Sequence, residues 1–307
     1  MRQNCDDDEV TEAQAATGFV NAHSHTFQRA LRGSEEGGDF WSWREAMLRL
    51  AEKQTPQSVR VEYEATYREM LAAGYATVGE FHYLGLEEAR AAAEAAEAAG
   101  IKIVVLLAAY ARGGLERFRQ ASPAEYLHQL EELGASGIAV GLAPHSVRAC
   151  PRDWLEEIGR YAEREGLVLH IHAGEQPREI EECVTEYGIR PIELLAEVGC
   201  LGPRTTVVHA THADERELDL LAEAGSRICA CPTTEADLGD GFLPTLAIAE
   251  RGIAICIGSD SNVCIDPREE LRELEWVARR QALRRGVFSN ATLNTFGTVE
   301  GERSLGL

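Results

Sequence analysis

Short apolar runs, several of them β-branched, alternate along this chain with longer segments whose apolar residues recur at helical spacing. Eight runs are predicted as buried strands: residues 18–25, 76–83, 101–109, 138–143, 167–173, 205–209, 227–231 and 253–258. Helices are predicted from about Trp41 to Ala73 and over residues 86–99, 123–133, 152–165, 177–198, 214–224, 243–250 and 267–285. The pattern therefore predicts a strand followed by a helix, repeated eight times.

This repeat favours a closed barrel over an open doubly wound sheet. The open sheet usually has fewer strands and a glycine-rich phosphate-binding turn after its first strand, and no G-x-G-x-x-G follows residues 18–25. A chain of 307 residues is long enough for an α/β barrel in one domain. We therefore predict a (β/α)8 TIM barrel over residues 18–307, preceded by a flexible acidic lead-in over residues 1–17.

Charge and composition exclude several classes of protein. The 51 acidic and 30 basic residues give a formal net charge of -21, which repels nucleic acid and anionic membrane surfaces. No apolar run approaches the roughly 20 residues of a membrane span, and no signal peptide is predicted. The eight cysteines are scattered, several of them inside predicted buried strands, which favours reduced thiols and a cytoplasmic enzyme. Cys229 and Cys231 are accordingly interpreted as core residues rather than metal ligands.

Candidate chemistry gathers at the C-terminal ends of the predicted strands, where (β/α)8 barrels carry their active sites. His23 and His25 are two positions apart in the first strand, so both side chains should share one face. An H-x-H pair alone is typical of a polar strand end, but His172, His209 and Asp260 end the fifth, sixth and eighth strands. Three imidazoles with one carboxylate suit Zn²⁺ or Fe²⁺ and leave a position for water.

Glu175 follows His172 by three residues, just beyond the fifth strand. A carboxylate there can reach a water beside a metal without ligating the ion, and it can carry protons between nucleophile and leaving group. His170 shares the parity of His172 but lies one layer deeper, so a hydrogen-bonded core role is favoured over ligation. His82 and His145 follow the second and fourth strands, where they could bind substrate.

Together these motifs resemble the amidohydrolase superfamily: His-x-His on the first strand, His-x-x-Glu after the fifth, His on the sixth and Ser-Asp after the eighth. Its two-metal members carry a carboxylated lysine at the end of the fourth strand, whereas Lys53 and Lys102 are the only lysines here. The resemblance thus implies the mononuclear deaminase type, with one divalent ion, zinc being expected and Fe²⁺ the alternative. It assigns the metal to His23, His25, His172 and Asp260. It assigns catalysis to Glu175, His209 and Asp260.

Three segments are similar to the formimidoylglutamate deiminases of this superfamily: Trp-Ser-Trp-Arg at residues 41–44, Glu-Phe-His-Tyr at 80–83 and Glu-Ala-Asp-Leu-Gly-Asp-Gly at 235–241. This similarity implies hydrolysis of N-formimidoyl-L-glutamate to N-formyl-L-glutamate and ammonia, a step of histidine degradation. It assigns substrate binding to Gln28, Arg44, Tyr83, His145 and Arg148. The roles of Arg44 and Arg148 also make physical sense, because a small dicarboxylate approaching so acidic a chain needs local guanidinium groups.

The resemblance covers residues 18–307. Family members flank the barrel with a small β-sandwich, which we expect to be absent or vestigial here, and they commonly form homodimers. Two alternative functions stay open on the sequence. One is a deaminase of a nucleobase-like or other amidine substrate, and the other is a non-catalytic or inactive truncated barrel.

Overall fold

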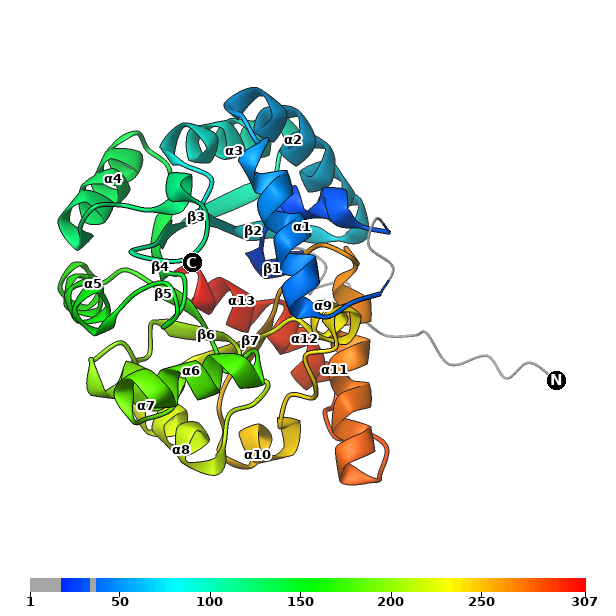
Figure 1. The fold of residues 1–307 in the computed structure, drawn as a ribbon. Coiled ribbons are helices and arrows are strands. Elements are labelled where there is room, and N and C mark those ends of the chain that lie inside the picture. The colour runs from blue at the N-terminus through cyan, green and yellow to red at the C-terminus, as the bar shows by residue number, and fades with distance from the viewer. Residues whose placement is uncertain (1–17, 34–36) are drawn as a thin grey trace.

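Eight parallel strands follow one another in chain order around a single sheet in the computed structural model, which describes residues 18–33 and 37–307. The strands are β1 (Phe19–Ser24), β2 (Tyr75–His82), β3 (Lys102–Ala109), β4 (Val140–Pro144), β5 (Leu169–Ala173), β6 (Thr205–His209), β7 (Arg227–Ala230) and β8 (Ile255–Ile257). Helices surround the sheet (Figure 1). The predicted (β/α)8 barrel is confirmed, while the predicted lead-in of residues 1–17 lies outside the described residues.

The helices fill the connections between strands and continue past β8. They are α1 (Phe40–Glu52), α2 (Pro56–Ala73), α3 (Leu86–Ala99), α4 (Pro123–Ala135), α5 (Arg152–Glu165), α6 (Pro177–Tyr187), α7 (Pro191–Glu197), α8 (Glu215–Ala224), α9 (Pro232–Leu238), α10 (Thr245–Glu250), α11 (Pro267–Ala282), α12 (Asn290–Gly297) and α13 (Val299–Ser304), with 3-10 turns η1 (Thr26–Leu31) and η2 (Glu116–Phe118). Helices α12 and α13 pack against β1 and β8 and cover the N-terminal end of the barrel. No helix among the described residues is long and apolar enough to cross a membrane.

Two helices that we predicted as continuous are each split in two. The first is interrupted before Thr55, whose side chain accepts a hydrogen bond from the Ser58 N–H and caps α2, with Pro56 in its first turn. The second separates into α6 and α7, because Gly188 ends α6 in a left-handed conformation and Pro191 begins α7. Proline lacks the N–H that a continuing helix needs and clashes with the preceding turn. Helix α9 was not predicted at all.

Side-chain and backbone hydrogen bonds close the barrel where β1 meets β8. The Asn21 side chain donates to Ser259 Oγ (2.6 Å) and accepts from the Ser259 N–H (3.0 Å). The Asp260 N–H donates to the His23 carbonyl (3.0 Å), and the His25 N–H donates to the Asp260 carbonyl (2.8 Å). All these residues are buried, so each polar group needs such a partner. The closure fixes the end of β1 against the loop that follows β8.

Gly258 allows this close approach, and its substitution tests it. A Cβ at Gly258 would lie 2.6 Å from the His23 carbonyl oxygen and 2.8 Å from the His23 Cβ. Gly258→Ala is therefore expected to lower the free energy of unfolding by about 1–3 kcal/mol in urea denaturation. Gly202→Ala is the matched control, because no atom lies within 4 Å of its added Cβ, and it should stay within about 0.5 kcal/mol of the parent. Equal stability of the two variants would contradict the closure.

Candidate metal centre and active site

Three histidines and one aspartate meet at the C-terminal mouth of the barrel. His23 lies on β1 and His25 directly follows it, His172 lies on β5, and Asp260 lies in the loop after β8. Their ligand atoms all lie within 4.8 Å of one another, and all four residues are buried. The structure thus brings together the four residues that the sequence assigned to a metal.

The separations between these atoms fit one divalent ion. Nε2 of His172 lies 3.1 Å from Nε2 of His23 and 3.3 Å from Nε2 of His25. Oδ1 of Asp260 lies 3.4 Å from the Nε2 atoms of His23 and His25. Zinc bonds of about 2.0–2.1 Å place neighbouring ligand atoms about 2.9–3.6 Å apart when a fifth position is left open for water. The donor set therefore has a spacing that fits zinc.

Backbone carbonyls orient two of the imidazoles. Nδ1 of His25 lies 2.9 Å from the Phe81 carbonyl oxygen, and Nδ1 of His172 lies 3.0 Å from the His145 carbonyl oxygen. A carbonyl can only accept, so in each ring Nδ1 carries the hydrogen and Nε2 keeps its lone pair for a metal. The Phe81 carbonyl lies on β2 and the His145 carbonyl directly follows β4, so these two strands fix the orientation of the two imidazoles.

The protonation states of the four residues also suit a metal. Burial lowers the pKa of His23 to about 3, and it lowers the pKa values of His25 and His172 as well, so these imidazoles are neutral. Burial alone would raise the pKa of Asp260, but the neighbouring His23 and His25 and the nearby His209 outweigh it and lower that pKa. Neutral imidazoles and an ionised carboxylate are the forms that bind divalent ions.

Glu175 and His209 lie beside this donor set. Oε1 of Glu175 is 3.7 Å from Nε2 of His209, and Oδ2 of Asp260 is 3.8 Å from the same nitrogen. On the other side of the ring, Nδ1 of His209 is 3.3 Å from Oε1 of Glu235. Burial lowers the pKa of His209, but the charges of Glu175, Asp260 and Glu235 and the hydrogen bond to Glu235 outweigh it and raise the pKa to about 10. His209 is therefore cationic and Nε2 can donate.

Backbone strain is concentrated in the same place. His209 and Asp260 have positive φ angles of 71° and 43°, and their neighbours Ala210 and Asn262 have 54° and 59°. Among the described residues, Leu283 is the only other non-glycine residue with positive φ. Such conformations cost of order 1–3 kcal/mol each and persist only where the surroundings enforce them. The hydrogen bonds between β1 and the loop after β8, and the turn after β6, hold these residues in that conformation.

Three of the five predicted substrate residues surround the metal centre. Nε2 of Gln28 donates to the Tyr83 hydroxyl (2.8 Å), and Oε1 of Gln28 has no partner within the described part of the chain. The ring of His145 stacks on that of His172 with centroids 4.7 Å apart. These side chains form one wall of the mouth.

The two predicted arginines differ in their contacts. Arg148 donates from Nη2 to Oε2 of Glu175 (3.1 Å), and its side chain is mostly buried. Among the described residues, Arg44 forms one ion pair, a long one of 4.0 Å with Glu45. The charges of both arginines lower the pKa of Tyr110, whose burial raises it beyond its usual range, so both guanidinium groups act on one side of the mouth. The contact between Arg148 and Glu175 was not predicted.

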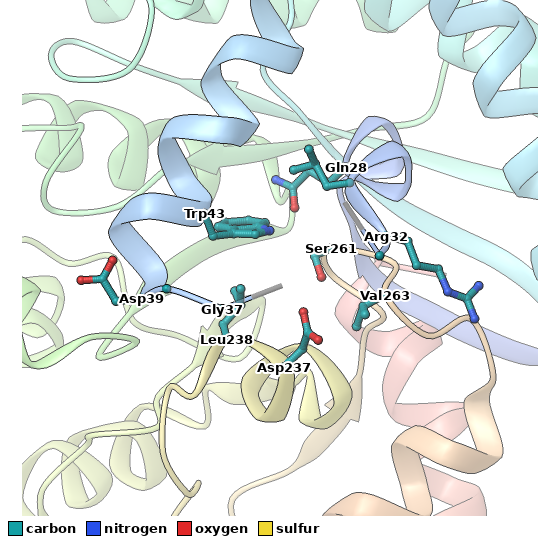
Figure 2. Close-up of a pocket in the computed structure, with 12 residues that line it drawn as sticks. Gln28, Arg32, Gly37, Asp39, Trp43, Asp237, Leu238, Ser261 and Val263 are labelled. Carbon is teal, nitrogen blue, oxygen red and sulfur yellow. The ribbon is translucent and has the colours of Figure 1, made fainter. Parts of the chain in front are cut away.

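A cavity of about 360 Å³ opens next to the centre. Figure 2 shows Gln28 and Trp43 on one side of it, with Leu238, Asp237 and Ser261 opposite. Ser261 directly follows Asp260, so the cavity borders the four converging residues. Its volume fits a small polar substrate.

Other histidines and cysteines do not join the site. His82 bonds the Gly85 carbonyl through Nε2 (3.2 Å) and packs beside Tyr63 of α2, on the outer side of β2, so the expectation that it could bind substrate was wrong. His170 bonds the Ser304 carbonyl through Nε2 (2.8 Å), as a core residue does. Cys231 lies close to His209 and Asp260, but burial raises its pKa well above the usual value, and it packs as a neutral thiol.

Several acidic residues near the site were missed by the sequence analysis. They are Glu235 beside His209, Glu179 whose Oε2 accepts from the Glu175 N–H (3.2 Å), and Asp240 bonded to Gln176. Glu235 and Asp240 lie in a segment that carried the family resemblance, and they had no assigned role because their place depends on α9. Glu179 looked like an ordinary residue of a helical face.

Comparison with known proteins finds one matching family and relatives that are named as deiminases or deaminases. The amidohydrolase family profile matches residues 16–307. A formimidoylglutamate deiminase of Pseudomonas aeruginosa is 36% identical over 305 residues, covering 90% of this chain and 67% of the relative. A 5-methylthioadenosine/S-adenosylhomocysteine deaminase of Haloarcula marismortui is 26% identical, covering 98% of this chain and 71% of the relative.

Solved structures agree with these relatives. An amidohydrolase from Brucella melitensis has a TM-score of 0.87 and 34% identity, covering 94% of this chain and 72% of that structure. An adenosine deaminase from Xanthomonas campestris with bound zinc has a TM-score of 0.85 and 26% identity, covering 94% and 67% of the two chains.

Metal content tests the role of the four converging residues. Zinc-reconstituted protein is expected to hold about one equivalent of metal by elemental analysis after dialysis, and His172→Ala should lower the affinity for zinc by at least about tenfold. His128→Ala on the exposed surface of α4 is the control and should keep the metal. Full zinc retention by His172→Ala would contradict the assignment.

Proposed function

Because the chain belongs to the amidohydrolase family and is a hydrolase, we propose that it is a metal-dependent deiminase of N-formimidoyl-L-glutamate. The products are N-formyl-L-glutamate and ammonia, as in histidine degradation. The observation that carries the proposal is the position of Glu175, between Arg148 and His209 and beside the four converging donors. That arrangement joins a proton carrier, a cation for a substrate carboxylate and a metal site in one mouth.

The residues present divide the reaction between them. When bound, the ion supplies Lewis acidity that lowers the pKa of a water toward about 7. Glu175 takes one proton of the attacking water as a C–O bond forms at the formimidoyl carbon, and passes it to the imino nitrogen as the C=N double bond becomes single. It then carries the remaining hydroxyl proton to the same nitrogen, which leaves as ammonia as the C–N bond breaks and the C=O bond forms. His209 donates from Nε2, which has no hydrogen-bond partner among the described residues, to the atom on which negative charge develops.

The substrate carboxylates are bound by guanidinium groups. The chain has a net charge of -21, so a dicarboxylate enters only where cations are concentrated. Arg44 and Arg148 supply them at the mouth, and Gln28, Tyr83 and His145 complete the wall. Zinc is the proposed metal, held by His23, His25, His172 and Asp260. The cytoplasm is the proposed compartment, since every described cysteine is a free thiol.

An aminopurine deaminase is the second candidate, favoured by the adenosine-type relatives named above. Ammonia release from metal-replete protein separates the two. We expect kcat/KM for formimidoylglutamate to exceed the values for 5-methylthioadenosine, adenosine, guanine and cytosine by at least ~10²-fold, because a neutral base offers no carboxylate to the guanidinium groups of Arg44 and Arg148. Preference for an adenosine substrate would overturn the proposal, and no release from any of them would favour an inactive barrel.

Glu175→Gln tests the proton carrier. It is expected to lower kcat at least ~10²-fold while the metal content stays unchanged, because the amide cannot accept a proton from water. Glu182→Gln on the exposed face of α6 is the matched control. Steady-state ammonia release with elemental analysis measures both quantities. Near-normal turnover by Glu175→Gln would contradict the role.

The contacts of the two arginines predict different kinetics. Arg44→Ala should raise KM about tenfold with little change in kcat, because the ion-pair partner of Arg44 in the described part of the chain is Glu45, which has no part in proton transfer. Arg148→Ala should raise KM and also lower kcat about tenfold, because it removes a charged contact to Glu175. An identical division between KM and kcat in the two variants would show that the contact with Glu175 has no catalytic consequence.

A further inference from the structure

Glu175 lies in a short turn between β5 and α6 that has few constraints of its own. Gly174 precedes it with a φ of 69°, and Gln176 follows it as the residue before the first turn of α6. The Glu175 N–H donates to the Glu179 side chain, and Arg148 bonds its carboxylate. These two contacts come from α6 and the loop after β4, while the His212 N–H holds the Gly174 carbonyl (2.8 Å) from the loop after β6. Proton transfer depends on how closely such a carrier is positioned.

A further constraint comes from across the mouth. Nε2 of Gln176 donates to Oδ1 of Asp240, which lies after α9 in the connection between β7 and β8. Gln176 is 9% exposed and Asp240 is 2% exposed, so the bond is shielded from competing water. It links the residue next to Glu175 to a segment 64 residues further along the chain.

The backbone of Asp240 is itself held by two hydrogen bonds. Its N–H donates to the Glu235 carbonyl (2.9 Å), and its carbonyl accepts from Nε2 of His212 (2.7 Å). Gly239 and Gly241 flank it with φ angles of 70° and 116°, which allow the tight turn that directs its side chain inward. Glu235 also holds Nδ1 of His209, so Asp240 is connected to both groups that move protons.

The charges around Asp240 favour its neutral form. Burial and the charge of Glu175 raise its pKa to about 9, with Glu235 and Asp260 adding to the rise and His209 opposing it. A neutral carboxyl can accept from Gln176 without placing another negative charge beside Glu175. Its second oxygen, Oδ2, has no hydrogen-bond partner among the described residues.

We propose that Gln176 and Asp240 form a clamp across the mouth of the barrel that positions Glu175 for proton transfer. The clamp consists of these two side chains and their one hydrogen bond. Asp240 is a positioning residue, because it acts through Gln176 on Glu175. The kinetic part of the argument rests on the proposed deiminase function, whereas the geometric part does not.

Kinetics of single and double variants separate positioning from simple stability. Asp240→Ala is expected to lower kcat ~10- to 100-fold with little change in KM or zinc content, as displaced catalytic groups do. In a Glu175→Gln background the same change should lower kcat less than ~3-fold, because the group it positions no longer works. Asp240→Asn, which keeps the Oδ1 acceptor, should retain at least about a third of kcat.

Asp219→Ala is the matched control, since its carboxylate is exposed and pairs with Arg251 on the surface, and it should behave like the parent. If Asp240→Ala lowers kcat by the same factor with and without Glu175, the clamp has no positioning role and the proposal is overturned. The proposal also fails if Asp240→Asn is as slow as Asp240→Ala.

Crystal structures test the clamp without any substrate. In Asp240→Ala, or in Gln176→Ala if the first variant does not fold, the Glu175 carboxylate is expected to leave its place 3.7 Å from Nε2 of His209. An unmoved Glu175 in the folded variant overturns the proposal. Absence of turnover with formimidoylglutamate in the parent protein would overturn only the proposed function, because the crystal structures still decide the position of Glu175.

Discussion

The closure of the barrel between β1 and β8 is the constraint on which the active site depends. Two metal-ligand candidates come from the end of β1, and a third lies in the loop after β8, 235 residues after His25 in the chain. The hydrogen bonds between Asn21 and Ser259 and between the backbones of His23, His25 and Asp260 hold these ends together. If this junction shifted by an ångström, the ligand separations of 3.1–3.4 Å would be lost.

Electrostatics then divides the buried groups by function. Imidazoles without a close carboxylate partner on both nitrogens stay neutral and present lone pairs, whereas His209 lies among Glu175, Glu235 and Asp260 and holds a proton. Backbone carbonyls at the ends of β2 and β4 orient two of these imidazoles, His25 and His172, for a metal, whereas the carboxylate of Glu235 on α9 makes His209 suited to donate.

Much of this site could be predicted, because it lies at strand ends, and strand ends are visible in the pattern of apolar residues. The alternation predicted the barrel, and the barrel predicted that His23, His172 and Asp260 converge. The pairing of Arg148 with Glu175 and the place of Asp240 were not predictable in this way. They depend on loop conformations and on α9, whose helical spacing is too short to detect before its neighbours are placed. Prolines at positions 56 and 191 were the visible signals for the helix breaks that were missed.

Anomalous diffraction from zinc-loaded crystals tests the central claim most directly, because it locates the metal without reference to activity. The account predicts one strong peak about 2.0–2.1 Å from Nε2 of His23, His25 and His172 and close to an oxygen of Asp260, with the Glu175 carboxylate near it but not bound to it. A peak placed instead between His209, Cys231 and Asp260, or no peak inside the barrel, would contradict it.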